Sequence, residues 1–187
     1  MQDLRAVRLC ASDSAFAALQ ADGEVVCWGD IATATGCSEA VALCSCEGSF
    51  AALRRDGTAV SWGRCDSLAV QPWLQNVKEL SATKLAFAAL RHDGHVVAWG
   101  PWYAGGQLDK ELTEVQEVVG THLAFAARTK KGTVHCWGSP KHGGDCRQVE
   151  DGLRTPRFAC FWMVWEPFMS DFQKDSRLFH GFSMDFR

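Results

Sequence analysis

The chain has 187 residues, of which 22% are charged and 47% hydrophobic, and its formal net charge is −3. This composition excludes an intrinsically disordered chain, and the slightly acidic balance argues against direct binding to nucleic acid or to an anionic membrane. No apolar run approaches the ~20 residues of a membrane-spanning helix, and residues 1–8 lack the apolar stretch of a secretory signal. We therefore expect a cytoplasmic or nuclear protein.

One phrase occurs four times along the chain: Phe-Ala-Ala, then a turn glycine, then Trp-Gly. In every copy the glycine follows the phenylalanine by 7 residues and the tryptophan follows it by 12, whereas successive copies are 34, 37 and 38 residues apart. Constant spacing within a copy and variable spacing between copies indicate one structural unit joined by tolerant loops. The repeat residues are Phe16, Gly23, Trp28, Phe50, Gly57, Trp62, Phe87, Gly94, Trp99, Phe125, Gly132 and Trp137.

Each copy predicts a β-hairpin, because an apolar run and a β-branched and aromatic run flank a glycine that supplies the positive φ of a tight turn. A further short strand is expected before each hairpin, at residues 7–9, 41–43, 77–80 and 115–119. The repeats then cover about residues 7–40, 41–76, 77–114 and 115–150, each with three or four antiparallel strands. A single sheet of this size cannot bury both faces, so neighbouring sheets must stack. The paired alanines favour the close approach found in a β-propeller over a sandwich.

The order Phe-Ala-Ala-Leu, Asp-Gly, Val-Val and Trp-Gly resembles the repeats of the regulator of chromosome condensation family. The segment Gly106-Gln107-Leu108-Asp109 is similar to the Gly-Gln-Leu-Gly loop of that family, and the resemblance covers about residues 7–150. It implies an all-β fold of short antiparallel sheets. Because family repeats run longer and a complete ring has seven blades, we expect a partial or compact, divergent propeller.

The best-known members of the family are a guanine-nucleotide exchange factor for a nuclear GTPase, HECT-type ubiquitin ligases and a plant ultraviolet-B receptor. The sequence has no inserted β-wedge of the exchange-factor kind, no room for a HECT domain and no Gly-Trp-Arg-His-Thr motif. The active parts of these members therefore do not carry over to this chain.

Other candidate chemistry is weak. Trp28, Trp62, Trp99 and Trp137 are expected to pack between blades, the alternative being a ring that stacks a ligand. Most cysteines occupy repeat positions that hold Ser, Ala, Thr or Val in other copies, which indicates small buried side chains. A weaker alternative is a zinc ion bound by Cys37, Cys44, Cys46 and Cys65. The six histidines occupy unrelated repeat positions. We therefore predict no catalytic residues, no cofactor and no metal, and hence no enzyme.

Cationic residues precede the turn glycine in the second, third and fourth copies. In a propeller such turns share a rim, so they are predicted to form a modestly basic patch that binds a protein partner, the alternative being ordinary solvated turns. The residues are Arg54, Arg55, Arg91, His92, Lys130 and Lys131.

The repeat pattern stops after about Asp151, and residues 151–187 form a separate aromatic-rich segment. Seven of the eleven phenylalanines lie between Phe158 and Phe186. The pattern predicts an apolar strand at residues 158–165 and a short amphipathic helix between Pro167 and Gly181. We expect this segment to cap the array; the alternatives are a central plug, a docking segment for a partner, or an aberrant tail.

Taken together, the sequence predicts a non-catalytic protein-interaction scaffold with a protein partner. One alternative is the substrate-recognition or regulatory part of a ubiquitin ligase, or an exchange factor acting on a small GTPase. Another is a propeller that binds a sugar or small ligand.

Overall fold

The computed structural model describes residues 6–30, 37–65 and 67–147. The chain divides into two units, residues 1–148 and 149–187, and the second unit lies outside the described residues. The strand and helix expected between residues 158 and 181 therefore lie outside them as well.

The described residues form four antiparallel sheets of three strands each, one for each predicted repeat, and this confirms the all-β prediction. Sheet 1 holds β1 (Ala6–Ala11), β2 (Ala15–Gln20) and β3 (Val25–Gly29). Sheet 2 holds β4 (Ala40–Cys46), β5 (Ser49–Arg54) and β6 (Ala59–Gly63). Sheet 3 holds β7 (Val77–Ala82), β8 (Phe87–Arg91) and β9 (Val96–Trp99). Sheet 4 holds β10 (Val115–Gly120), β11 (Ala124–Thr129) and β12 (Val134–Gly138).

The segments that follow β6, β9 and β12 contain short 3-10 helices in place of a fourth strand. These are η1 (Gln71–Trp73), η2 (Trp102–Ala104) and η3 (Pro140–His142). Within the described part of the chain, no helix has the length and apolar character needed to cross a membrane.

The strand register is the same in all four sheets. The first strand of each sheet carries a register shift at its start, for example between Ala6 and Arg8 in β1 and between Val77 and Glu79 in β7. The hairpin places each repeat phenylalanine opposite the repeat tryptophan. The two rings stack with centroids 5.5, 6.0, 5.4 and 5.3 Å apart in sheets 1 to 4. Identical spacing in the sequence thus produces identical pairing in the fold.

Each sheet has two unlike faces because side chains alternate along a strand. The face with the stacked phenylalanine and tryptophan is called the Phe face. The opposite face carries small residues and, in sheets 1 to 3, a leucine at one repeat position; it is called the Ala face. Its alanines and leucines are Ala17, Leu19, Ala51, Leu53, Ala88, Leu90 and Ala126.

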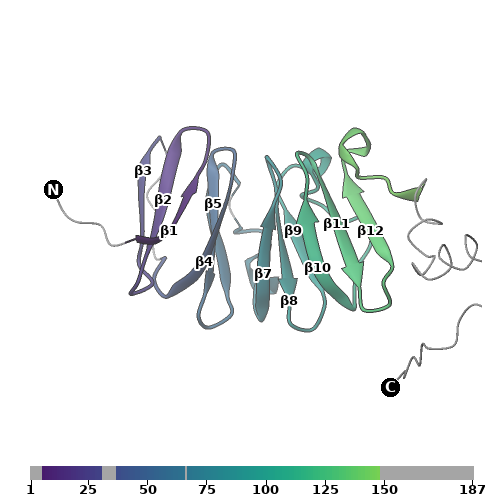
Figure 1. Cartoon of the computed structure of the whole chain (residues 1–187), viewed down its shortest axis with the longest axis horizontal. Helices are drawn as coiled ribbons and strands as arrows, with labels where there is room; N and C mark the ends of the chain where they lie inside the picture. Colours follow the sequence, from purple (N-terminus) through teal and green to yellow (C-terminus); the bar gives the residue numbers. More distant parts are fainter. Residues whose placement is uncertain (1–5, 31–36, 66, 148–187) are drawn as a thin grey trace, which may run out of the picture. The chain divides into compact units, whose positions relative to one another are not determined.

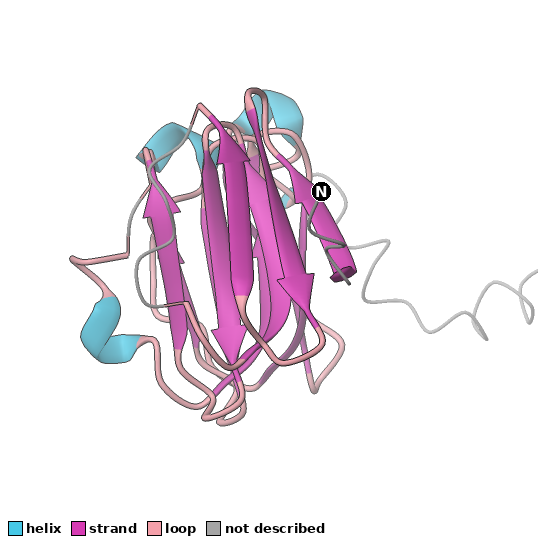
Figure 2. Ribbon diagram, turned by 90° about the vertical axis from the view of Figure 1, so that its left-hand side faces the viewer, coloured by secondary structure: helices cyan, strands magenta, loops and turns pink. Residues whose placement is uncertain are grey.

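The sheets stack in sequence order, and Figure 1 shows sheet 1 (purple) and sheet 4 (green) at opposite ends of the row. Figure 2 looks along this row, with the strands of successive sheets running one behind another. Every interface follows one rule: the Phe face of a sheet packs on the Ala face of the sheet before it. Phe50 packs with Ala17 and Leu19 of sheet 1, for example, and all three side chains are buried. The alanines permit this close approach because they leave room for the aromatic rings.

Backbone hydrogen bonds also join the sheets along the hairpin turns. In sheets 1 to 3 the carbonyl of the turn glycine accepts a bond from the first strand of the next sheet, as in the 2.8 Å bond from the Val77 amide to Gly57. A second bond lies within each following sheet: the carbonyl of the residue just before the first strand accepts a bond from the hairpin turn. In sheet 3, the His92 amide donates to the Asn76 carbonyl at 2.8 Å. The edge formed by these turns, residues 20–24, 54–58, 91–95 and 129–133, is called the turn rim. A ladder of main-chain bonds fixes its position from sheet to sheet.

Candidate functional site

Several cysteines have thiols whose pKa values are raised. Burial raises the pKa of the Cys37 thiol to about 11 and that of Cys44 to about 12, so neither forms a nucleophilic thiolate near neutral pH. The pKa of Cys46 is raised by a hydrogen bond with Cys65 and by burial. Within residues 6–30, 37–65 and 67–147, no three His, Cys, Asp or Glu side chains gather as a metal ion requires.

The repeat tryptophans lie against the sheets rather than in a ligand-binding ring. Trp99 and Trp137 are buried, and their indole N–H groups donate 2.9 Å bonds to the Ser61 hydroxyl and the Gly105 carbonyl. Trp62 is partly buried, whereas Trp28 of sheet 1 is 43% exposed. Trp28 is more exposed than the other three because a preceding sheet covers the Phe face of sheets 2 to 4, whereas sheet 1 has no preceding sheet among the described residues.

The repeat glycines Gly23, Gly57, Gly94 and Gly132 sit in the hairpin turns with φ between +80° and +91°. In the first three turns an aspartate accepts a bond from the amide two residues on, which closes the turn; the distance is 2.8 Å from Thr58 to Asp56. In the fourth turn, Lys131 replaces the aspartate, and Thr129 and Thr133 bond to each other at 2.6 Å instead. The turns therefore keep one shape while their side chains differ.

The predicted rim residues differ in their exposure. Arg55, His92 and Lys130 occupy the same turn position, are exposed, and are named the tip residues. Their amides are fixed by 2.8 Å bonds to the carbonyls of Glu39, Asn76 and Glu114 respectively. In contrast, Arg54 and Arg91 are partly buried at the ends of their strands. Lys131, the sixth predicted residue, is exposed as well, and its ammonium is paired with Glu114.

Acidic residues accompany the cations on the turn rim, and the sequence prediction did not include them. Arg91 pairs with Asp93 at 2.8 Å, and Lys131 pairs with Glu114 at 3.1 Å. His95 lies 3.2 Å from Asp93 and 3.3 Å from Glu111. The rim therefore carries mixed charge rather than a plain basic patch. Asp93 belongs to the turn itself, whereas Glu111 and Glu114 precede the first strand of sheet 4.

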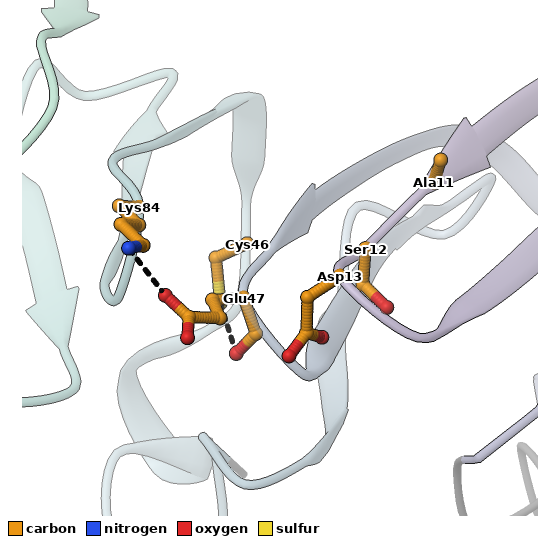
Figure 3. Close-up of a pocket in the computed structure, with 6 residues that line it drawn as sticks. All are labelled: Ala11, Ser12, Asp13, Cys46, Glu47 and Lys84. Atoms are coloured by element: carbon orange, nitrogen blue, oxygen red, sulfur yellow. Dashed lines mark hydrogen bonds and ion pairs between the residues drawn. The ribbon is translucent and has the colours of Figure 1, made fainter.

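The opposite edge of the array holds a shallow pocket of about 340 Å³, which Figure 3 shows. It lies where the loops between the first and second strands of sheets 1 to 3 meet. Asp13, Glu47 and Lys84 occupy equivalent positions in these loops and line the pocket, and the Lys84 ammonium lies 3.0 Å from the Glu47 carboxylate. The Glu47 amide donates to the Lys84 carbonyl, and the Lys84 amide donates to His122 at 2.8 Å. Sequence reasoning missed this row because only the stacking of the sheets reveals it.

A second pocket, of about 520 Å³, borders the loop Gly106–Asp109 that resembles the family's Gly-Gln-Leu-Gly segment. It is lined by Trp102, Leu108 and Pro140 together with the polar side chains of Gln107 and Asp109. Trp102 is 73% exposed and packs edge-on against Tyr103 with centroids 5.9 Å apart. This loop thus adds an exposed aromatic surface to the array.

No family model matches the sequence. A search of curated proteins likewise gives no match.

Solved structures do match the fold. The WD40 ectodomain of the receptor kinase ACR4 from Arabidopsis thaliana aligns at 17% identity over 73% of this chain and 51% of that one, with a TM-score of 0.56. Human WBSCR16 aligns at 20% identity over 74% and 49% of the two chains, with a TM-score of 0.50. Prp20p from Saccharomyces cerevisiae, which is yeast RCC1, aligns at 16% identity over 71% and 43%, with a TM-score of 0.51.

The chain thus spans about half the length of these solved structures. At these identities the likeness shows the fold, and it agrees with the repeat spacing, the Phe–Trp pairing and the stacking order described above. The four sheets are repeats of the β-propeller fold, of the kind that the yeast regulator of chromosome condensation carries.

Proposed function

We propose that the protein is a non-catalytic interaction scaffold that binds a protein partner through the tip residues of its turn rim. The observation that supports this proposal is that the turns share one hydrogen-bonded backbone arrangement but carry different exposed side chains. The same ladder of backbone bonds holds the turns of sheets 2 to 4, while the exposed side chain at the tip changes from Arg55 to His92 to Lys130.

Rigid presentation favours recognition because a partner then binds groups that are already ordered. The tips Arg55 and Lys130 offer cationic side chains, and the neighbouring acids Glu39 and Glu114 offer carboxylates. A partner surface of mixed and opposite charge fits such a rim. We place acidic groups of the partner against the tips, since Arg55 and Lys130 are exposed and positively charged.

The test is affinity capture with two matched variants. Arg55→Glu with Lys130→Glu reverses two tips, and Arg64→Glu with Lys141→Glu makes the same charge change away from the turn rim. All four side chains are exposed, so both variants should keep the thermal stability of the parent chain. We expect the tip variant to lose specific proteins that the parent and the control variant both retain. Equal capture by all three chains would refute the rim as the binding surface.

The identities of the captured proteins also test the alternatives. The solved structure of Prp20p is described together with its binding to Gsp1p and to histones. Capture of a small GTPase, followed by faster nucleotide release when the chain is added, would support action as an exchange factor. Capture of ubiquitin-ligase components would support the second alternative.

A further inference from the structure

The two ends of the row of sheets expose opposite halves of the interface that the array uses internally. In sheets 2 to 4 the repeat phenylalanine is at most 1% exposed, because the Ala face of the preceding sheet covers it. In sheet 1, Phe16 is 49% exposed and Leu9 is 63% exposed. The equivalent of Leu9 in sheet 2 is Leu43, which is only 2% exposed. The Phe face of sheet 1 therefore lacks the cover that its counterparts have.

Sheet 4 presents the complementary face. Val119 lies opposite Ala126 on its Ala face and is 54% exposed. Arg128 replaces the leucine of the other three sheets, and its guanidinium is held by Glu117 at 3.0 Å and Gln116 at 2.9 Å. Because this charge is satisfied within sheet 4, the alkyl stem of Arg128 is left at the leucine position, where it can cover apolar surface.

Among the residues that the structure describes, the backbone ladder ends at sheet 4. A methyl group built on Gly23 would lie 2.8 Å from the Glu39 Cα, and one built on Gly94 would lie 3.1 Å from the Glu114 Cα, because the next sheet lies beside each turn. At Gly132 the same methyl group would meet nothing within 4 Å. The turn of sheet 4 thus has open space where each earlier turn meets a following sheet.

We propose that the protein associates with a second copy of itself, the Phe face of sheet 1 in one copy packing on the Ala face of sheet 4 in the other. The contact is head to tail, since it joins two different faces. In a closed pair both copies use both faces, and the amide of Ala6 donates to the Gly132 carbonyl of the second copy, as Val77 donates to Gly57.

Two observations favour a second copy over another occupant. The chain carries both halves of an interface that it already forms three times internally, so the required complementarity exists without a new surface. In addition, the chain spans about half of each of the two propellers from Arabidopsis and human, so that two copies hold the blades of one ring of that size.

The test is sedimentation of the full chain and of variants with one blocked face. Leu9→Glu blocks the Phe face of sheet 1, and Val119→Glu blocks the Ala face of sheet 4; both residues are exposed, so the fold should persist. Val41→Glu, at a 48% exposed position of the internal sheet 2, is the matched control. We expect the parent chain and the control to sediment as dimers at micromolar concentration, and each blocked variant as a monomer with an unchanged circular dichroism spectrum.

Mixing the two blocked variants gives the decisive result. Each variant keeps the face that the other has lost, so an equimolar mixture should recover a one-to-one complex held by a single interface and weaker than the parent dimer. A chain that carries both substitutions should stay monomeric when mixed with itself. A parent chain that is monomeric throughout, or a mixture that never forms the complex, would overturn the proposal. A parent dimer that survives both blocked faces would also overturn it.

Discussion

Replacing Phe87 by alanine tests the energetic basis of the stacked sheets. Phe87 is 0% exposed, stacks on Trp99 with centroids 5.4 Å apart, and belongs to the core that sheet 3 forms with Ala51 and Leu53 of sheet 2. Removing such a ring costs its transfer free energy and leaves a cavity, which together amount to about 3–5 kcal/mol. Phe16, the equivalent residue of sheet 1, is 49% exposed. Its replacement loses about half of the transfer free energy and leaves no closed cavity, so roughly 1–2 kcal/mol is expected.

The assay is urea unfolding of both variants, measured in the Val119→Glu background so that self-association does not contribute and both rings keep their surroundings. The two substitutions are chemically identical, so the difference in unfolding free energy reports only what covers each ring. We expect Phe87→Ala to be the more damaging by about 2 kcal/mol or more. Equal losses for the two variants would refute the reasoning, because the Phe face of sheet 1 would then be as well covered as that of sheet 3.

Three further predictions concern single positions. Gly132 and Gly138 both have positive φ, but a methyl group on Gly138 would lie 2.7 Å from the Leu123 carbonyl oxygen, whereas one on Gly132 would meet nothing within 4 Å. Thermal melting should therefore show that Gly132→Ala loses about 1 kcal/mol of stability and that Gly138→Ala loses considerably more. The Thr83 hydroxyl is buried and bonds to Ala104 and Ala86 at 3.0 Å, so Thr83→Val should cost about 1–3 kcal/mol, more than Thr121→Val at the equivalent exposed position. Hydrogen bonds from the hydroxyl and amide of Thr58 lower the pKa of Asp56. Because the pKa of Asp56 is lower in the folded state than in the unfolded one, its carboxylate stabilises the fold above about pH 4, and this stabilisation is lost as the pH falls further. Asp56→Asn should therefore be less stable than the parent at neutral pH and equally stable in acid, as thermal melting across pH would show.

Much of the fold follows from the sequence because each repeat encodes its own hairpin. The fixed spacing from Phe87 to Gly94 to Trp99 determines the turn and the register locally, without reference to other repeats. The register shift at the start of each first strand leaves no equally clear signal, since it depends on how that strand meets the hairpin turn.

The site was less predictable because it depends on neighbours. Phe16 and Phe50 occur in nearly identical sequences, yet one is half-exposed and the other is buried, and only the stacking order explains this difference. The same order brings Glu47 of sheet 2 to Lys84 of sheet 3, 37 residues further along the chain. Repeat spacing identified the turn rim, but it could not show which cations are paired and which ones are exposed tips.

The most direct measurement is the affinity of a captured partner, purified, for the parent chain and for the two charge-reversed variants. If the rim is the binding surface, Arg55→Glu with Lys130→Glu will raise the Kd at least about tenfold, and Arg64→Glu with Lys141→Glu will bind like the parent. Added salt will also raise the Kd of the parent chain, because it screens the charges of the rim. An unchanged Kd for the tip variant, with the control variant equally unaffected, would contradict the claim that this rim is where the scaffold holds its partner.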